Sequence, residues 1–413
     1  MADVLYSERE ASRLMRWTVA VVAMAALTLT ARAAEASARA LSEIHVPQDA
    51  ATLPLAIAQA QPGDTIVLDA GTYPGGAVVP AQKHDITIVG VDRNGVVFDG
   101  GDTRKNGIVV HADGVSILNM SAHNFLENAF YWDGADRFRA SYLTAWNVRG
   151  YGVYVENGQD GTIDHSYVSG AADAAYYVGE CRPCRATIAN VVAVRSAVGY
   201  SGTNSSGVLI RDSVWSGNGA GIVPNTYANE ALPPESATTI VGNVITGSGR
   251  ERVPIHTALA GFVGAGVAIA GGNENIVRGN RITDSERYGI AVFATARYVT
   301  FNPQAREPGP RWRPHGNRVT GNVVTGSGWA DLAFASGSGP RNCFAANTAV
   351  KTLPRDLQTA SCATGALHGD RTVASVLMAP VRRMFDETLR RRRPPAYTSL
   401  PAPPPQPGMP GRG

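Results

Sequence analysis

The chain has 413 residues, of which 45 are glycine, and only 17% of its residues are charged. This length admits two average domains or one long repetitive domain, and the glycine content favours the repetitive one. A formal net charge of +3 is too small to predict a nucleic-acid partner. The composition therefore predicts a glycine-rich repeat protein that is long enough to bury a large core.

Residues 1–40 have the order of a secretory signal peptide. Basic residues ending at Arg16 precede an apolar run of 14 residues, 17–30, and small-residue cleavage sites follow between Ala33 and Ala40. The run is shorter than the ~20 residues of a spanning helix, which disfavours the alternative of an uncleaved anchor. We expect a secreted, periplasmic or cell-envelope protein with no stable membrane insertion after cleavage.

A short amphipathic helix is predicted over 51–60, and the first strands of a coil over 62–73. From Gly107 to Ala349 the sequence then returns about every 23 residues to one pattern: an apolar strand, a small polar residue, a second strand, a glycine-rich turn and a Gly-Ile-x-Val strand. Strands of three to five residues without helices between them cannot form βαβ units, but they can stack ~4.8 Å apart around one core. Residues 41–366 are therefore predicted to form an all-β, single-stranded right-handed parallel β-helix of about ten coils. The helix is expected to cap its open N-terminal end.

Three features occur together in this chain: Ala-x-Pro-Gly-Asp-Thr-Ile at 60–66, Gly-Thr-Tyr at 71–73, and the repeated Asn-x-Ile and Gly-Ile-x-Val motifs. In these features the chain, over about 46–364, resembles the pectin-lyase-like right-handed β-helix proteins. The resemblance implies the fold. For the activity it leaves open polysaccharide lyases, glycoside hydrolases, uronate epimerases, phage tailspikes and copper-associated periplasmic maturation proteins.

Tyrosines recur every 23 residues and mark one face of the predicted coil. They are Tyr131, Tyr154, Tyr177 and Tyr200, and Val223 falls at the next step. Because their neighbours are apolar, strand alternation is expected to turn all four rings outward along one face. They are predicted to bind substrate, the alternative being ordinary packing between neighbouring strands.

Carboxyl groups are expected beside the same face. Asp133 and Glu156 follow their strands at equivalent positions and should lie in adjacent coils, with Asp173 and Glu180 nearby. Stacked carboxylates can act as acid and base or hold Ca²⁺, and no other cofactor is expected. The alternative is a set of ordinary surface acids at turns.

Polar residues at the bend between two strands are predicted to be structural. They are Asn119, Asn190, Asp212, Asn243, Asn280, Asn322 and Asn347. Side-chain amides at this bend can bond to the backbone of neighbouring coils.

Three coils are longer than the others, with extra residues around 226–238, 247–264 and 294–315. Repeat proteins usually place insertions on the binding face, so these are expected to wall a groove beside the tyrosines. The third insertion holds Arg297, Tyr298, Arg306, Arg311, Trp312, Arg313 and His315. Arginine forks bind carboxylates and aromatic rings stack on sugars, which favours an acidic polysaccharide, although the loop could equally be a solvated rim.

Lyase or epimerase chemistry needs a cation that neutralises a uronate carboxylate and groups that remove and return a proton. The candidate cations are Arg287, Arg297 and Arg313, and the candidate bases or acids are Tyr288, His256 and His315. The chain has no Asp-Pro-His run of the kind that uronate epimerases carry, and no matched aspartate pair as in pectin hydrolases.

The sequence therefore predicts a protein that binds and modifies an extracellular or envelope polysaccharide by elimination, epimerisation or hydrolysis. The alternative is a non-catalytic carbohydrate-binding or surface protein that uses the same groove. A periplasmic copper-associated maturation factor is a third interpretation, but its ligands are scarce here, with 7 Met and 8 His in total. Nothing in the sequence predicts an oligomeric state.

The four cysteines are expected to form two local disulfides, Cys181 with Cys184 and Cys343 with Cys362, because an exported protein meets an oxidising compartment. Residues 367–393 are expected to form a C-terminal helix or cap. The proline-rich segment 394–413 cannot build a core and is expected to be disordered.

Overall fold

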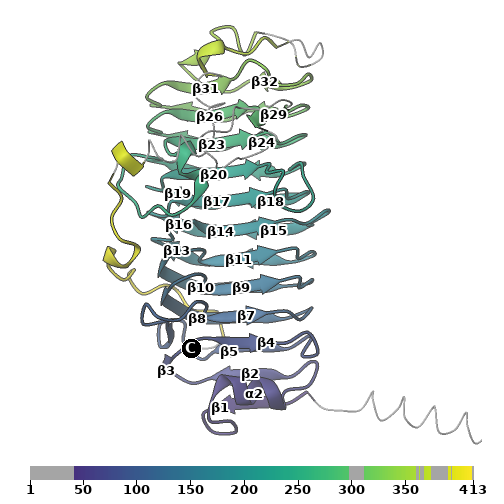
Figure 1. The fold of residues 1–413 in the computed structure, drawn as a ribbon, viewed down its shortest axis with the longest axis vertical. Helices are drawn as coiled ribbons and strands as arrows, with labels where there is room; N and C mark the ends of the chain where they lie inside the picture. The colour runs from purple at the N-terminus through teal and green to yellow at the C-terminus, as the bar shows by residue number, and fades with distance from the viewer. Residues whose placement is uncertain are drawn as a thin grey trace, which may run out of the picture. The chain divides into compact units, whose positions relative to one another are not determined.

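The computed structural model describes residues 41–296, 311–359, 362, 367–373, 389–391 and 393–411. Within the unit Glu43–Gly413, successive coils of the chain stack on one another and pair through parallel strands (Figure 1). The predicted all-β right-handed parallel β-helix is confirmed, with about 13 turns instead of about ten. The predicted signal peptide, 1–40, lies outside the described residues.

A full coil has three short strands. In the described part of the chain, the first and second strands form a 20-stranded sheet and the third strands an 11-stranded sheet, which we call the third-strand sheet. The first strands are β1 Glu43–Val46, β2 Thr65–Leu68, β5 Thr87–Gly90, β12 Thr162–Asp164, β15 Ala186–Ala189, β18 Val208–Arg211, β21 Thr239–Val241, β24 Ile276–Arg278, β29 Arg318–Thr320 and β32 Cys343–Ala345. The second strands are β3 Gly71–Tyr73, β6 Val96–Asp99, β13 Tyr167–Ser169, β16 Val192–Val194, β19 Val214–Ser216, β22 Val244–Thr246, β25 Arg281–Thr283 and β30 Val323–Thr325. First and second strands are continuous in β8 Ser116–Phe125 and β10 Arg139–Val148. The third strands are β4 Ala77–Val79, β7 Ile108–Val110, β9 Phe130–Asp133, β11 Val153–Glu156, β14 Ala174–Gly179, β17 Val198–Thr203, β20 Ala220–Asn225, β23 Ala265–Ala270, β26 Tyr288–Phe293, β31 Ala330–Phe334 and β33 Thr352–Leu353.

The helix expected over 51–60 is α2, Leu53–Gln59, which contacts β1, β2 and β4 at the N-terminal end of the coils. The Thr52 hydroxyl accepts a hydrogen bond from the Leu55 amide and thereby caps the helix. Leu53, Ala56 and Ile57 are buried, so the apolar stripe of the helix covers core that the first coil would otherwise expose.

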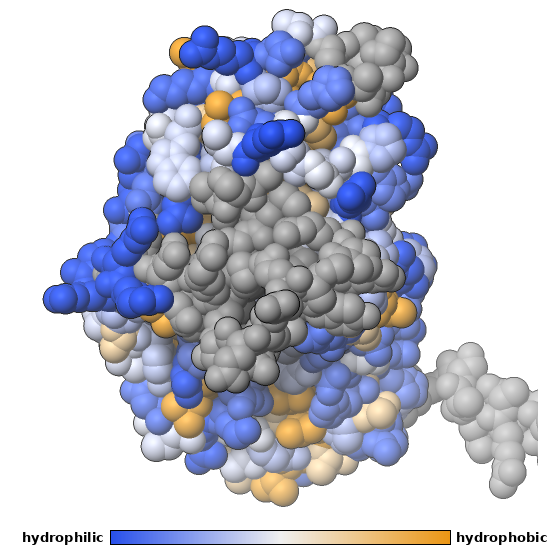
Figure 2. Space-filling model, turned by 45° about the horizontal axis from the view of Figure 1, so that its top comes forward, coloured by the Kyte–Doolittle hydropathy of each residue, from blue (hydrophilic) through white to orange (hydrophobic). Residues whose placement is uncertain are grey.

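One continuous core fills the inside of the coils. In β11, Val153 and Val155 are fully buried while the side chain between them, Tyr154, faces outward. Trp132 and Trp215 are among the largest side chains in this core. Figure 2 shows mostly hydrophilic side chains on the visible face, with scattered hydrophobic patches. The alternation of inward apolar and outward polar residues therefore works as the sequence predicts.

The polar residues predicted to form one ladder at the first bend occupy two neighbouring positions and form two ladders. Asn119, Asn190 and Asp212 adopt a left-handed backbone conformation, with φ of 59°, 55° and 50°, at the position that glycine occupies in later coils. The inward ladder lies one residue further along, at Asn243, Asn280, Asn322 and Asn347. The amide of Asn243 donates to Oδ1 of Asn280 at 2.9 Å, and this bond repeats from coil to coil. The bend therefore uses residues that tolerate positive φ, and the next side chain carries the hydrogen bonds.

Three coils carry long loops at the predicted places. Loop 1 (226–238) follows β20, loop 2 (247–264) precedes β23, and loop 3 (294–315) follows β26. Loop 2 contains the turn η1 Ala258–Phe262, and the base of loop 3 is the antiparallel pair β27 Thr295–Ala296 and β28 Arg311–Trp312. Loop 2 therefore borders the edge where the third strands begin, and loops 1 and 3 border the edge where they end.

The two predicted disulfides, Cys181–Cys184 and Cys343–Cys362, are confirmed. Most of the predicted C-terminal cap, 367–393, lies outside the described residues, but Asp370 pairs with Ala335 at the end of the third-strand sheet. Among the described residues, no helix has the length and apolar character needed to span a membrane.

The structure differs from the expected disorder of the proline-rich tail. Its described residues, 394–411, lie against the early coils, with the short turn η2 Tyr397–Ser399 against β10. The tail needs no core of its own, because side chains on the coils bond to its backbone, as described below.

Glu235 is a carboxyl group buried at the end of loop 1. It accepts hydrogen bonds from the Thr238 hydroxyl at 2.7 Å and the Asn275 amide at 2.9 Å. Burial raises its pKa to about 8, against the lowering effect of these two bonds. Because the pKa is raised in the folded state, the protonated carboxyl stabilises the fold, and this stability is lost as the pH rises toward 8.

We therefore expect Glu235→Gln to flatten the pH dependence of stability. Between pH 5 and 8 the parent should lose up to about 1.4 kcal/mol per pH unit through this group, and the variant should lose less. Urea unfolding of both proteins at pH 5, 6.5 and 8 measures the difference. Equal slopes for parent and variant would show that Glu235 does not titrate in this range.

Candidate functional site

The tyrosine face lies on three neighbouring third strands, β9, β11 and β14. Tyr131, Tyr154 and Tyr177 pair in register across them, as their spacing of 23 predicts. The rings of Tyr131 and Tyr154 stack with centroids 4.6 Å apart, and Tyr177 meets Tyr154 edge-on at 4.8 Å. Tyr151, just before β11, stacks on Tyr154 at 4.3 Å. Four rings therefore form one aromatic cluster on the outer side of the third-strand sheet, in which Tyr177 is almost fully buried.

Tyr200 is not part of this face, and the prediction that it lies there is wrong. Tyr200 pairs with Tyr176, and both side chains are fully buried in the core. Ser201 takes the outward position beside Tyr177, and Val223 follows it. The coil that contains β15 and β16 is longer than 23 residues, so the register shifts by one residue at this strand.

Glutamates gather at the end of the tyrosine strands. Asp133 and Glu156 occupy equivalent positions in adjacent strands, as predicted. Oε2 of Glu156 accepts hydrogen bonds from the hydroxyls of Tyr131 at 2.7 Å and Tyr154 at 3.0 Å. Burial raises the pKa of the Glu180 carboxyl, and the charge of Glu156 and a hydrogen bond with it raise it further. Two glutamates of adjacent coils therefore share a site with two tyrosine hydroxyls.

Loop 1 adds a third glutamate to this group. The amide of Ala231 donates to Oε2 of Glu180 at 2.9 Å, which ties the loop to the strand end. Glu230 is exposed as a residue, but partial burial of its carboxyl, together with the charge of Glu180, raises the pKa of Glu230 to about 7. Tyr227 folds back toward the face, and among the described residues its buried hydroxyl has no hydrogen-bond partner.

Loop 2 reaches back to the other edge of the tyrosine face. The amide of His256 donates to the carbonyl of Ala172 at 2.6 Å, and its Nε2 lies 3.0 Å from the Arg149 guanidinium. Burial and the Arg149 charge lower the pKa of His256. Burial raises the pKa of Asp173 to about 6, against hydrogen bonds from Thr257 and Tyr151.

These groups surround a hollow of about 460 Å³. Its charged and polar lining includes Lys105, Glu127, Arg149, Tyr151, Asp173 and His256. The hollow is continuous with the tyrosine face, because Tyr151 lines the hollow and also stacks on Tyr154 of the face. The predicted residue His256 is therefore brought to the site, although from a loop three coils beyond the coil of Ala172.

The other predicted catalytic residues lie elsewhere. Arg287 and Tyr288 belong to the coil of β26, which is separated from β11 by five strand spacings, or ~24 Å. There Tyr288 is almost fully buried against Trp329, and burial raises its pKa to about 12. His315 bonds through its amide to Asn273, at the far edge of the coils.

Loop 3 contributes little that can be assigned to the site. Arg297, Tyr298 and Arg306 lie outside the described residues. The backbone of Arg311 is part of β28, the Trp312 side chain is half-buried beside Gly271, and Arg313 is exposed. None of these described positions reaches the tyrosine face.

No group of three or more His, Cys, Asp or Glu side chains in the described part of the chain is arranged to hold a metal ion. Sequence reasoning missed Tyr151, Tyr227 and Glu230 as site residues. The position of Tyr151, three residues before Tyr154 and next to the strand, was the one available signal. The loop residues carry no periodic signal.

The observations define the class of the molecule: the chain is a right-handed parallel β-helix repeat protein. A family model described as right handed beta helix region matches residues 106–304. The chain is similar to an alginate lyase from Paenibacillus sp. str. FPU-7, with 16% identity over 68% of this chain and 94% of that chain and a TM-score of 0.50. It is also similar to the A-module of the Azotobacter vinelandii mannuronan C-5 epimerase AlgE4, with 15% identity over 66% of this chain and 82% of that chain and a TM-score of 0.48. The likeness to the alginate lyase shows the fold alone. No match was found among curated proteins.

Proposed function

We propose that the protein acts on an extracytoplasmic polysaccharide and hydrolyses its glycosidic bonds on the tyrosine face. The observation that carries this proposal is the meeting of Glu156, Glu180 and Glu230 beside the rings of Tyr131, Tyr154 and Tyr177. Aromatic rings bind the apolar faces of sugars, and carboxyl groups in unlike environments provide both an acid and a base.

The roles follow from the surroundings of each carboxyl group. Glu156 accepts two tyrosine hydroxyls, which suits a carboxylate that acts as base or nucleophile. Glu230, with its pKa raised to about 7, keeps a proton near neutral pH and donates it to the leaving oxygen. Glu180 positions both of these groups, since it bonds to Glu156 and to the backbone of loop 1, which carries Glu230.

The charge around the face favours an uncharged polysaccharide. Five carboxyl groups lie on or beside it: Asp133, Glu156, Asp173, Glu180 and Glu230. The cations Lys105 and Arg149 are confined to the hollow at one edge. A polyuronate would be repelled by these carboxyl groups.

Two findings support a polysaccharide substrate and a location outside the cytoplasm. The alginate lyase with which the chain shares its fold acts, by its name, on a polysaccharide. The two disulfides fit an oxidising compartment outside the cytoplasm, in agreement with the signal-like N-terminus.

A non-catalytic carbohydrate-binding protein is the second candidate. The observation that favours it is the engagement of the Tyr131 and Tyr154 hydroxyls with Glu156, which would also occur in a purely structural cluster. Incubation of the protein with neutral and uronate-containing polysaccharides separates the two. New reducing ends indicate hydrolysis, absorbance of unsaturated uronates indicates a lyase, and binding without either indicates the second candidate.

Both candidates predict that Tyr154→Ala weakens polysaccharide binding. Loss of the central ring should cost about 1–3 kcal/mol, or roughly 5–150-fold in affinity. Affinity electrophoresis or calorimetry with the best polysaccharide of the panel measures it. Tyr167→Ala is the matched control, because Tyr167 is a half-buried tyrosine of the second-strand row. Equal binding by both variants would remove the tyrosine face from the proposal.

A further inference from the structure

The proline-rich tail runs back along the coils toward their N-terminal end (Figure 1). The carbonyl of Arg393 accepts a hydrogen bond from Arg252 of loop 2. Further along, the Tyr397 hydroxyl donates to Asp102 at 3.2 Å. The tail therefore contacts elements far apart in the sequence.

Side-chain amides on the coils bond to the backbone of the tail. Asn94 makes a pair of bonds with Gln406: its Nδ2 donates to the carbonyl and its Oδ1 accepts the amide, both at 2.9 Å. Oδ1 of Asn119 accepts the amide of Met409 at 2.8 Å. Nδ2 of Asn147 donates to the carbonyl of Leu400 at 3.1 Å. These bonds recognise an extended backbone and depend little on its side chains.

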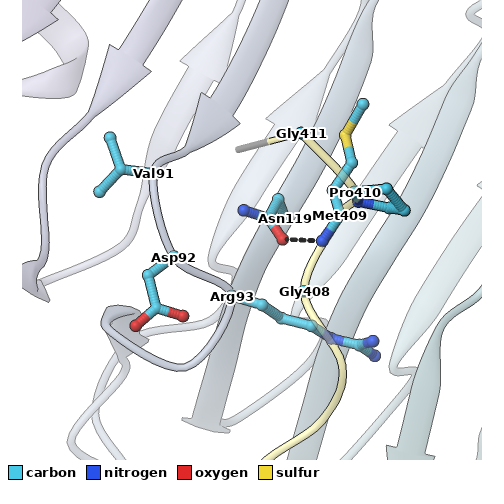
Figure 3. Close-up of a pocket in the computed structure, with 8 residues that line it drawn as sticks. All are labelled: Val91, Asp92, Arg93, Asn119, Gly408, Met409, Pro410 and Gly411. Atoms are coloured by element: carbon cyan, nitrogen blue, oxygen red, sulfur yellow. Dashed lines mark hydrogen bonds between the residues drawn. The ribbon is translucent and has the colours of Figure 1, made fainter. Parts of the chain in front are cut away.

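Arg93 is a buried cation beneath the tail. Only 2% of its surface is exposed, and its guanidinium donates to the Thr144 hydroxyl and to the carbonyls of Leu143, His165 and Pro407. Figure 3 shows the Arg93 side chain extending below Gly408, with Asn119 bonded to Met409. The tail thus supplies one of the acceptors that satisfy this arginine.

Apolar contacts fix the position of the tail along the coils. Met409 packs on Val67, Val89 and Leu118, which form a small apolar cluster outside the main core. A Cβ atom added at Gly170 would lie 2.7 Å from Cδ1 of Leu400, so this glycine makes room for the leucine. The contacted face is thus shaped for two apolar anchors nine residues apart.

We propose that this face, formed by Arg93, Asn94, Asn119 and Asn147 with the Met409 cluster, is a binding site for extended proline-rich peptides. The chain's own tail is its ligand. The backbone angles of Ala396 (−62°, 144°) and Leu400 (−82°, 141°) are those of polyproline II, which prolines hold in place before binding. The site is independent of the proposed hydrolase function, because it lies on the first and second strands.

The test uses the full chain with a tail that no longer docks. Leu400→Asp combined with Met409→Asp should release the tail and expose the site. A fluorescent peptide of residues 396–411 should then bind this double variant, measured by anisotropy, and bind the parent at least 10-fold more weakly, because the attached tail competes. Ala402→Asp is the control for an added carboxylate, since it places one aspartate at an exposed tail position, and it should behave like the parent.

A third substitution tests the groups on the coils. Asn94 is exposed, so Asn94→Ala leaves the core intact and, added to the double variant, should weaken peptide binding about 10-fold. Hydrogen exchange at the Gln406 and Met409 amides should be slow in the parent and fast in the double variant. Failure of the peptide to bind the double variant, binding unaffected by Asn94→Ala, or fast exchange at both amides in the parent would each overturn the proposal.

Discussion

Replacing Glu230 with Gln is expected to lower the rate of glycoside hydrolysis about 10³-fold, while polysaccharide affinity stays within a few-fold of the parent. Glutamine keeps the size and hydrogen-bonding groups of the side chain but cannot donate a proton to the leaving oxygen. Because Glu230 has a pKa raised to about 7, it is protonated below that pH and ionised above it. The parent rate should therefore fall about tenfold per unit as the pH rises above about 7.

Reducing-end release from pH 5 to 9, in parent and variant, measures both effects. Glu251→Gln is the matched control, because Glu251 is an exposed glutamate of loop 2 and should leave rate and pH profile unchanged. A Glu230→Gln protein that keeps the rate and the same alkaline fall would assign the acid to another group. If Tyr154→Ala still weakened binding, the tyrosine face would remain a binding site without this catalytic role.

The strand residues of the candidate site could be predicted from the sequence, because strand alternation and a constant repeat length are local rules. Residues 23 apart become neighbours as long as each coil has the same number of residues, which holds from Tyr131 to Tyr177. The coil with the Cys181–Cys184 loop breaks this rule: Thr162 pairs with Thr187 and Tyr176 with Tyr200, 25 and 24 positions apart. A surface turn can gain or lose one residue at little cost in stability. Each such change reverses which side chains of the next strand face the core.

The loop residues of the candidate site could not be predicted from the sequence, for a different reason. Glu230 and His256 sit on loops that fold back over earlier coils, as the bonds of Ala231 with Glu180 and of His256 with Ala172 show. No repeat relates these partners. The tail illustrates the same limit: its composition indicates that it has no core, but not that asparagine side chains elsewhere bond to its backbone.

The two polar ladders at the first bend give the largest expected change in stability. Asn280 stands in the middle of the inward ladder and is almost fully buried. Its Oδ1 accepts the amide and the Nδ2 of Asn243, and its own Nδ2 donates to the carbonyl of Ile240 and to Oδ1 of Asn322, at 2.9–3.0 Å. Removal of this side chain leaves several buried polar groups in neighbouring coils without partners.

Asn280→Ala is therefore expected to lower the free energy of unfolding by about 3–5 kcal/mol, since each unsatisfied buried group costs ~1–3 kcal/mol and water replaces only part of the loss. Asn190→Gly is the matched control: Asn190 is exposed, its φ is 55°, and glycine adopts that conformation freely, so the change should stay within about 0.5 kcal/mol. Urea unfolding followed by circular dichroism compares the two. Similar losses for both variants would mean that the Asn190 side chain contributes as much to the bend as the inward amides do.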